Sequence, residues 1–349
     1  MDADRLFELL TRFLPAHSPG GDEGELDQLL LPHFEQTCRE VRQDAADNLI
    51  GLLRGTGERP PIIIAAHKDE VGMIVKRVEA DGKLRLEELG GVPPWKYGEG
   101  MVDILADSGI LQGVMGVGCM HTSSETPAVE SAREKALDWS MVRVMTRRTA
   151  AELEALGVGP GTRVVVARQR KQPVRFQDCV CGHALDDKAA LAVMVEVMHT
   201  LAQGAPPPQD IYFVATSIEE QLGGGATFAA SHIRADAMLA LEIGPAEDEY
   251  GLQLDHRPIV WYKDRIATYS KGFCDELSLL GRSLGFGVQK AVYSRAGTDA
   301  SGSSQMGHVG RTAVLAFPAT NSHGWEVAPV EGILNMYHLL LAYLRGERG

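Results

Sequence analysis

Apolar and polar residues recur with helical spacing near the start of the chain and form strand-like runs after it. The helical spacing predicts helices over residues 3–14 and about 23–37. Continuous apolar stretches, NLIGLLRG and PIIIAAH, predict strands over 48–55 and 61–67. The second stretch is apolar at successive positions, which is typical of a central strand covered by helices on both faces.

The pattern changes over residues 73–175, where short β-like runs are interrupted by glycine, aspartate and proline. These runs predict a small all-β domain. Beyond it, strands alternate with helices up to a closing helix over 330–346, which predicts a three-layer α/β/α domain with a mostly parallel sheet. The α/β domain is therefore expected to comprise residues 1–72 and 176–349, with the β domain as an insertion.

The composition excludes some classes of protein. The 34 Lys and Arg residues stand against 47 Asp and Glu residues, a net charge of -13, so we expect no nucleic-acid partner. No apolar run reaches the roughly 18 residues of a membrane span, so we expect no membrane association. The acidic, amphipathic N-terminus is unlike a signal peptide. Five scattered cysteines predict reduced thiols and a cytoplasmic location. The basic run RQRKQPVR, residues 168–175, is predicted to be a solvated junction between the domains.

Polar residues gather where the predicted strands end. They follow three strands, start one helix and occupy one late loop: His67, Asp69, Asp186, Asp187, Glu219, Glu220, Glu242 and His323. Ligands of open α/β sheets bind beyond the carboxyl ends of the strands, so these side chains are expected to meet at one edge. Without cations, so many carboxylates would repel one another and take up protons.

Each feature alone has a simpler interpretation. Asp186 and Asp187 are suited to cap a helix, Glu219 and Glu220 are suited to a solvated strand end, and a single loop histidine is usually unremarkable. The combination favours divalent metal. Histidine with carboxylate suits zinc, and also cobalt or manganese.

A pair of metal ions roughly 3.5–4 Å apart needs one bridging carboxylate and about two further ligands for each ion. Five candidate ligands are available: His67, Asp186, Glu220, Glu242 and His323. Three carboxylates and one hydroxide would balance the charge of two dications. Asp69 lies two residues after His67, so period-two alternation predicts that its carboxylate contacts the second ring nitrogen of His67.

The segments AHKDEVG, ALDDKAA, IEEQLGGGA and SHGWE resemble, in order and spacing, motifs of the tetrahedral (TET) family of co-catalytic metallo-aminopeptidases. The resemblance extends over essentially the whole chain. It implies that the inserted domain is PDZ-like and serves assembly, that the subunits form a homo-oligomeric dodecamer, and that the Asp186–Asp187 peptide bond is cis.

The resemblance also implies a role for each candidate residue. Asp186 would bridge the two metal ions. Glu220 and His323 would hold one ion, and His67 and Glu242 the other. Glu219 matches the general base of the family, and Asp69 matches the acid that supports the catalytic site.

Two departures from the family pattern affect substrate preference. Glu242 stands where the family usually has aspartate, although related dinuclear carboxypeptidases and deacylases have glutamate there. The loop FPATNSHGWE before and after His323 differs from the usual Pro-x-Arg-Tyr-x-His-Ser pattern.

The predicted function is hydrolysis of N-terminal residues from peptides or small peptide-like substrates, with a metal-activated water and Glu219 as base. The alternative is an N-deacylase or a carboxypeptidase of the same dinuclear clan, which Glu242 favours. A glycosidase would need two carboxylates but neither of the histidines. The segment GTDAS, residues 297–301, is expected either to line the substrate pocket or to form a turn.

Overall fold

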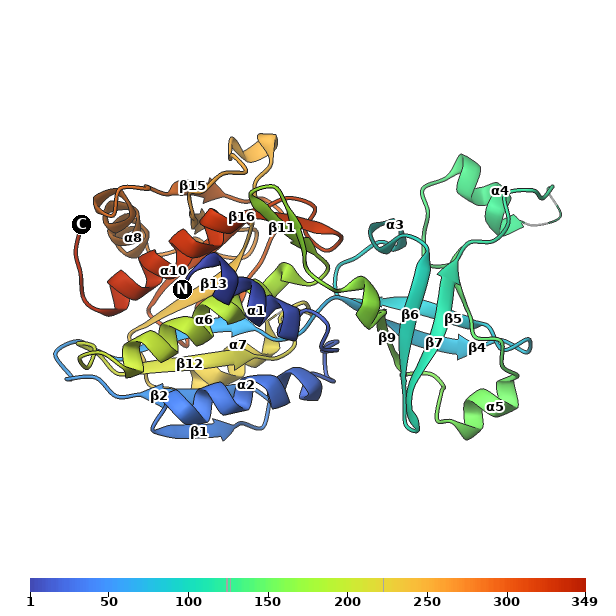
Figure 1. Ribbon diagram of the computed structural model, residues 1–349, viewed down its shortest axis with the longest axis horizontal. Helices are drawn as coiled ribbons and strands as arrows, with labels where there is room; N and C mark the ends of the chain where they lie inside the picture. The colour runs from blue at the N-terminus through green and yellow to red at the C-terminus, as the bar shows by residue number, and fades with distance from the viewer. Residues whose placement is uncertain (124, 126, 222) are drawn as a thin grey trace.

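The computed structural model describes residues 1–349 except 124, 126 and 222. Within this part of the chain, eight strands form a mixed central sheet in the larger of two lobes (Figure 1). Its order is β1-β2-β12-β3-β13-β16-β14-β15. The strands are β1 (Glu40–Gln43), β2 (Leu49–Leu53), β3 (Ile62–His67), β12 (Ile211–Thr216), β13 (Ala237–Pro245), β14 (Ile259–Lys263), β15 (Gln289–Val292) and β16 (Arg311–Ala319).

The centre of this sheet is parallel, because β12, β3, β13 and β16 pair in parallel. Antiparallel pairing begins towards the edges, between β12 and β2, β2 and β1, and β16 and β14. The carboxyl ends of the four central strands therefore meet at one edge, where ligands of such sheets bind.

Helices cover the sheet on both faces, as the complete burial of β3 requires. Helices α6 and α10 pack together against the sheet with α1 and α2 beside α6, whereas α7 and α9 pack against each other and against central strands. The helices are α1 (Ala3–Phe13), α2 (Gly24–Thr37), α6 (Leu185–Ala202), α7 (Gly224–His232), α8 (Lys271–Ser283), α9 (Asp299–Gln305) and α10 (Val330–Leu344), with a 3-10 turn η2 (Asp248–Tyr250). The predicted α/β fold, with helices on a central sheet, is confirmed.

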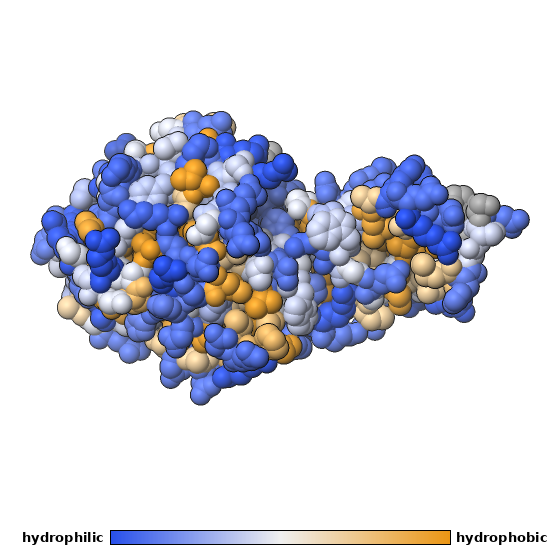
Figure 2. Space-filling view, turned by 90° about the horizontal axis from the view of Figure 1, so that it is seen from above, coloured by the Kyte–Doolittle hydropathy of each residue, from blue (hydrophilic) through white to orange (hydrophobic). Residues whose placement is uncertain are grey.

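The smaller lobe is a closed barrel of six strands in the described part of the chain. Its strands pair antiparallel, and it has a hydrophobic cluster of its own between Met73 and Val166. Figure 2 shows it as a separate lobe joined to the α/β lobe by a narrower neck. Its elements are β4 (Gly72–Val78), β5 (Leu84–Leu89), α3 (Pro94–Tyr97), β6 (Gly100–Ala106), β7 (Gly109–Gly116), α4 (Pro127–Glu134), β8 (Arg143–Met145), α5 (Ala150–Ala155) and β9 (Arg163–Val166).

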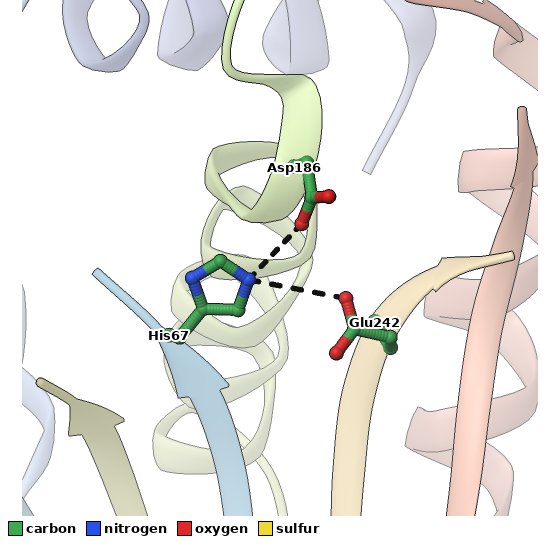
Figure 3. Close-up of side chains that lie close together, drawn as sticks. All are labelled: His67, Asp186 and Glu242. Atoms are coloured by element: carbon green, nitrogen blue, oxygen red, sulfur yellow. Dashed lines mark hydrogen bonds and ion pairs between the residues drawn. The ribbon is translucent and has the colours of Figure 1, made fainter. Parts of the chain in front are cut away.

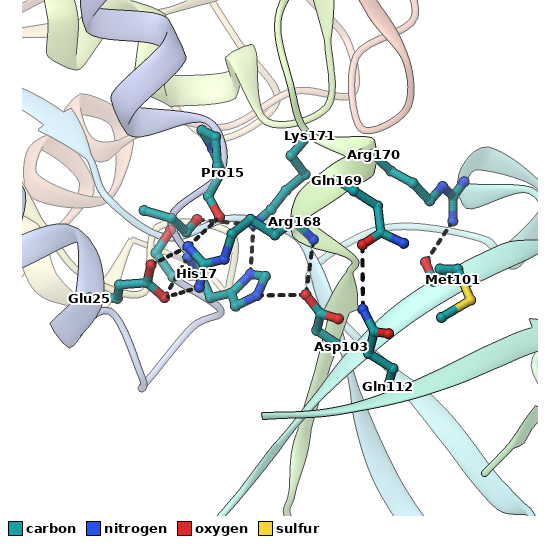
Figure 4. A network of polar contacts seen from close by, with 12 residues as sticks. Pro15, His17, Glu25, Met101, Asp103, Gln112, Arg168, Gln169, Arg170 and Lys171 are labelled. Carbon is teal, nitrogen blue, oxygen red and sulfur yellow. Dashed lines mark hydrogen bonds and ion pairs between the residues drawn. The ribbon is translucent and has the colours of Figure 1, made fainter. Parts of the chain in front are cut away.

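The chain returns from the barrel through a 3-10 turn, η1 (Arg168–Arg170), and enters a small antiparallel sheet of order β10-β11-β17. Its strands are β10 (Val174–Phe176), β11 (Cys179–Gly182) and β17 (Glu326–Pro329). The predicted solvated junction is wrong at Lys171, whose side chain is fully buried and whose Nζ donates to Glu70 Oε1 at 2.7 Å. Beside Lys171, His17 Nε2 of the α/β lobe lies 3.0 Å from Asp103 Oδ2 of the barrel (Figure 4).

All five cysteines are free thiols. Among the described residues, no helix is long and apolar enough to cross a membrane.

Candidate metal centre and active-site pocket

The first part of the site lies at the carboxyl edge of the central strands. His67 is the last residue of β3, Glu242 lies within β13, and Asp186 stands in the first turn of α6. Figure 3 shows the three side chains pointing toward one another from these separate elements. His67 Nε2 lies 3.0 Å from Asp186 Oδ1 and 3.9 Å from Glu242 Oε1. All three residues are buried.

The second part of the site contains Asp186 again, together with Glu220 and His323. His323 Nε2 lies 3.3 Å from Glu220 Oε2 and 3.5 Å from Asp186 Oδ2. Asp186 therefore directs one carboxylate oxygen to each histidine. The first turn of α6 departs from helical geometry at Asp186 and Asp187, and the peptide bond between them is cis, as the resemblance implied.

Two turns present these side chains to the edge of the sheet. Ile218, two residues after β12 ends, has φ of 54°, and His323 has φ of 63°. A β-branched residue such as isoleucine rarely adopts this left-handed conformation. The turn at Ile218 brings Glu219 and Glu220 to the site, and backbone outliers of this kind concentrate where function requires a fixed geometry.

The environment of each histidine leaves one ring nitrogen available to a metal. His67 Nδ1 lies 2.8 Å from the backbone carbonyl oxygen of Asp69, and His323 Nδ1 lies 3.0 Å from that of Gly91. A carbonyl oxygen only accepts, so each Nδ1 carries the proton and donates. With a cation bound, each ring would direct the lone pair of Nε2 into the site, which is the arrangement metal-binding histidines require.

The carboxylate of Asp69 lies within ion-pair distance of the second ring nitrogen of His67, but its hydrogen bonds go to the backbone of the next turn. Its Oδ1 lies 3.6 Å from His67 Nδ1, whereas Oδ1 and Oδ2 accept hydrogen bonds from the backbone N–H groups of Glu219 and Glu220 at 2.9 and 3.0 Å. Asp69 therefore acts on the turn that carries the two glutamates, and on His67 through its main-chain carbonyl.

The charges of the site interact strongly. Burial raises the pKa of Glu219, Glu220 and Glu242 well above their usual value, and neighbouring carboxylates raise it further. Burial would lower the pKa of His67, but its hydrogen bond to Asp186 raises the pKa well above the usual value. In the absence of cations, protons would supply the positive charge that this cluster needs.

The residues fit a pair of divalent cations. His67, Asp186 and Glu242 form one group of ligand atoms within 4.8 Å of one another, and Asp186, Glu220 and His323 form a second. Imidazole and carboxylate donors suit zinc, cobalt and manganese. Cations would replace the protons of the buried carboxyls, and a bound metal ion lowers the pKa of its neighbours.

The comparison with protein families agrees with this geometry. The sequence matches the family described as M42 glutamyl aminopeptidase over residues 47–339. The chain belongs to the M42 peptidase family. It is therefore an enzyme of the aminopeptidase class.

Curated relatives of this M42 peptidase carry different names. It is 26% identical over 244 residues to a putative aminopeptidase of Acetivibrio thermocellus, a match that covers 70% of this chain and 67% of that protein. It is 27% identical to the lysyl aminopeptidase of Pyrococcus furiosus over 97% of this chain and 96% of that one. It is 23% identical to the glutamyl aminopeptidase of Lactococcus lactis, over 70% and 68% of the two chains.

Solved structures share its fold. An aminopeptidase from the archaeon Desulfurococcus kamchatkensis superposes with a TM-score of 0.87 at 22% identity, over 99% of this chain and 96% of that chain. The TET1 peptidase of Pyrococcus horikoshii superposes with a TM-score of 0.86 at 23% identity, over 97% and 99% of the two chains.

Three buried carboxylates of this M42 peptidase support the site without having been assigned a role from the sequence. Glu326 accepts from the backbone N–H groups of Asp186 and His323 at 3.1 and 3.0 Å. Asp187 accepts from the backbone N–H of His67 at 3.3 Å, and Asp299 accepts from the hydroxyl of Thr216. Glu326 lies in the motif SHGWE and Asp299 in GTDAS, so their positions were visible, but local spacing did not reveal their contacts.

A cavity of about 320 Å³ opens from the metal centre. Asp186, Glu219, Glu220, Glu242 and His323 line it, together with Gly297 and Thr298 of the GTDAS segment. Thr298 caps α9, which begins at Asp299, so this segment both lines the pocket and starts a helix.

Proposed function

We propose that this M42 peptidase removes N-terminal residues from peptides and holds two divalent cations. The observation that supports the proposal best is that Asp186 directs its two carboxylate oxygens to two different histidines. One cation would lie among His67, Asp186 and Glu242, and the other among Asp186, Glu220 and His323. Zinc is the proposed metal, with cobalt or manganese as alternatives.

When bound, the two cations acidify a water molecule and polarise the peptide carbonyl. Glu219 is the proposed general base. Its Oε2 lies 4.0 Å from His67 Nε2, so the carboxylate faces the space among the ligands, where it can accept a proton at Oε2 and return it to the leaving amine. Burial raises the pKa of Glu219, which suits a group that takes up and releases a proton near neutral pH.

The lining of the pocket supports a substrate with a free N-terminus. Glu219, Glu220 and Glu242 are carboxylates at the cavity wall. The cations would balance the charge of Glu220 and Glu242, so Glu219 is the carboxylate of this wall whose charge would favour an amino group over a neutral acylated nitrogen. The second candidate function is N-deacylase or carboxypeptidase chemistry, which the glutamate at position 242 supports by analogy with related dinuclear enzymes.

Substitution of the base tests the catalytic assignment. Glu219→Gln in the metal-loaded enzyme is expected to lower kcat by about 10²–10⁴-fold while the metal content, measured by elemental analysis, stays at the wild-type level. Glu331→Gln changes an exposed glutamate of α10 and serves as the matched control. Full turnover by Glu219→Gln would refute this base.

A substrate panel separates the two candidate functions. Aminoacyl p-nitroanilides report removal of an N-terminal residue, whereas N-acetylated amino acids report deacylation and N-blocked dipeptides report carboxypeptidase activity. We expect turnover of the first class. Turnover confined to blocked substrates would favour the second candidate.

We further propose that residues 1–72 and 176–349 act as the catalytic domain and that residues 73–175 form a PDZ-like domain for assembly. The TET1 peptidase of Pyrococcus horikoshii can assemble into a tetrahedron or a large octahedral shell. By analogy, the proposed assembly is a tetrahedral dodecamer in the cytoplasm. Size-exclusion chromatography with light scattering measures the mass of the particle in solution. A mass of about twelve subunits is expected, and a stable monomer would contradict the proposed dodecamer.

A further inference from the structure

Different parts of the molecule hold the two histidines of the metal centre. His67 Nδ1 donates to the carbonyl oxygen of Asp69 within the α/β lobe, whereas His323 Nδ1 donates to that of Gly91 in the barrel. The two cations proposed above are called the His67 cation and the His323 cation after these residues. The orientation of one histidine ring therefore depends on where the barrel places a loop.

The barrel loop also packs on the surroundings of the His323 cation. A Cβ at Gly90 would lie 3.3 Å from the Cβ of Glu220. A Cβ at Gly324, the residue after His323, would lie 3.3 Å from both Cε and the carbonyl oxygen of Lys96 in α3. Glu220 and His323 are the two ligands that the His323 cation does not share with the His67 cation, and this loop lies against both.

Arg170 fixes the end of the loop from outside the barrel. Its Nη2 donates to the carbonyl oxygen of Tyr97, the last residue of α3, at 2.7 Å. Its Nη1 donates to the carbonyl oxygen of Met101 at 3.1 Å (Figure 4). The last carbonyl groups of a helix have no partner within the helix, so the guanidinium supplies a donor that α3 lacks.

Arg170 is in turn fixed to the α/β lobe by the residue that follows it. Lys171 is fully buried, and its Nζ donates to the carbonyl oxygen of Ala16 at 2.9 Å and to Glu70 Oε1 at 2.7 Å. Both acceptors belong to the α/β lobe, so the position of Arg170 is set by the lobe that carries the metal ligands. A continuous series of contacts therefore leads from that lobe through Arg170 and α3 to the ring of His323.

We propose that Arg170 is a positioning residue for the metal centre. It holds α3 and the loop of Gly91 against His323, and it thereby sets the affinity of the His323 cation while leaving that of the His67 cation unchanged. The inference rests on the proposed two-cation function. It gives the inserted barrel a part in metal binding in addition to the assembly proposed for it.

Calorimetric titration of the chelator-treated full chain with Co²⁺ tests the proposal. We expect the wild type to bind two ions per chain. Arg170→Gln is too short to reach both carbonyls, so one ion should bind about tenfold more weakly, as when a contact that orients a ligand is lost, while the other keeps its Kd. Arg170→Lys keeps the charge but has a single nitrogen and should give a smaller loss.

Arg175→Gln is the matched control, because Arg175 belongs to the same junction but is exposed and pairs with Asp4. It should keep both Kd values of the wild type. Urea unfolding of the chelator-treated variants shows whether each one folds. If Arg170→Gln does not fold, the comparison is made with Arg170→Lys, for which an unchanged pair of Kd values would overturn the proposal.

Double variants identify the cation that Arg170 affects. In a His67→Ala background, which retains the His323 cation, Arg170→Gln should weaken the remaining ion by about tenfold. In a His323→Ala background, which retains the His67 cation, it should have no further effect, because residues that act through one another are not additive. Equal weakening in both backgrounds, or weakening only in the second, would overturn the positioning role.

The titration of the wild type separates this inference from the proposed function. Uptake of fewer than two Co²⁺ ions by the wild type would refute the two-cation centre itself. Uptake of two ions by the wild type, with the same two Kd values in both Arg170 variants, would overturn the role of Arg170 alone.

Discussion

The carboxylate of Asp69 and the backbone of Glu219 are joined by a hydrogen bond of 2.9 Å from the Glu219 N–H to Asp69 Oδ1. The other oxygen of Asp69 accepts from the backbone N–H of Glu220 at 3.0 Å. One buried side chain thus fixes both the proposed base and a proposed metal ligand. The same residue accepts from the ring of His67 through its main-chain carbonyl, so Asp69 lies at the centre of the site without belonging to either ligand group.

Asp69→Asn tests this supporting role. Asparagine has one acceptor oxygen, so one of the two backbone N–H groups would face an amide N–H₂ group and the turn at Glu219 would shift. Loss of such a supporting contact typically lowers activity or metal affinity by about 10–100-fold. We expect kcat to fall more than KM rises. Asp22→Asn, at an exposed aspartate, is the control, and equal kinetics of the two variants would contradict the role.

The inserted barrel also contributes to the site, through the loop after β5. The carbonyl oxygen of Gly91 accepts from His323 Nδ1. Gly90, just before it, has φ of +90°, and a Cβ there would lie 3.0 Å from Val71 Cγ1 and 3.3 Å from the Cβ of Glu220. A Cβ at Gly91 would meet no atom within 4 Å.

These neighbouring glycines provide a matched pair of variants. Gly90→Ala is expected to destabilise the protein by about 1–3 kcal/mol, the cost of a strained backbone residue, and to weaken metal binding because Glu220 must move. Gly91→Ala should have a smaller effect on both the free energy of unfolding and the metal affinity. Urea unfolding and a competitive metal-chelator titration measure the two effects, and a reversed order would show that the loop does not support the site.

The sequence predicts most elements that surround the site, because their apolar periodicity is local. The strands β2 and β3 and the closing helix α10 lie where the pattern placed them, and strands alternate with helices after the barrel as predicted. The short strands β14 and β15, of which β15 lies at the edge of the sheet, were not predicted individually, because short strands have weak patterns. The segment GTDAS has the composition of a turn, yet it begins α9.

Long-range contacts were the part that the sequence could not reveal. Lys171 stands in a basic run that is typical of a solvated surface, but its partner Glu70 lies 101 residues away. The direction of the Asp69 carboxylate depends on where β3 ends and on a turn 150 residues later. Such contacts are set by the packing of whole elements, which residue spacing does not encode.

Removal of metal should lower the stability of the protein. A ligand that binds only the folded state adds about 2.7 kcal/mol at a concentration one hundred times its Kd. We expect a chelator to lower the Tm measured by scanning calorimetry, and zinc, cobalt or manganese to restore it. Asp186→Asn alters both ligand groups, so adding the metals should raise the Tm of this variant much less than that of the wild type. A Tm that does not respond to chelation would refute a resident metal centre.

The buried ion pair between Glu70 and Lys171 is expected to stabilise the folded protein at neutral pH and to lose this effect in acid. Glu70 also lies 3.5 Å from Lys188 Nζ, and all three side chains are buried. Burial alone would raise the pKa of Glu70, but the two lysines lower it to about 2 from an ordinary value of 4.5. Because the folded-state pKa is the lower one, the unfolded chain binds the proton first, so the stabilisation is complete above 4.5 and disappears as the pH falls toward 2.

Glu70→Gln should therefore be destabilising in a pH-dependent manner. Near pH 6 it leaves two buried ammonium groups without a counter-charge, and breaking a buried pair in this way costs about 3–5 kcal/mol. Wild type and variant should converge between pH 4.5 and 2, since protonation removes the charge of Glu70 in the wild type. Urea unfolding of chelator-treated protein at several pH values measures the difference, with the exposed Glu35→Gln as control. A difference that stays constant as the pH falls would mean that Glu70 contributes through its shape and not through its charge.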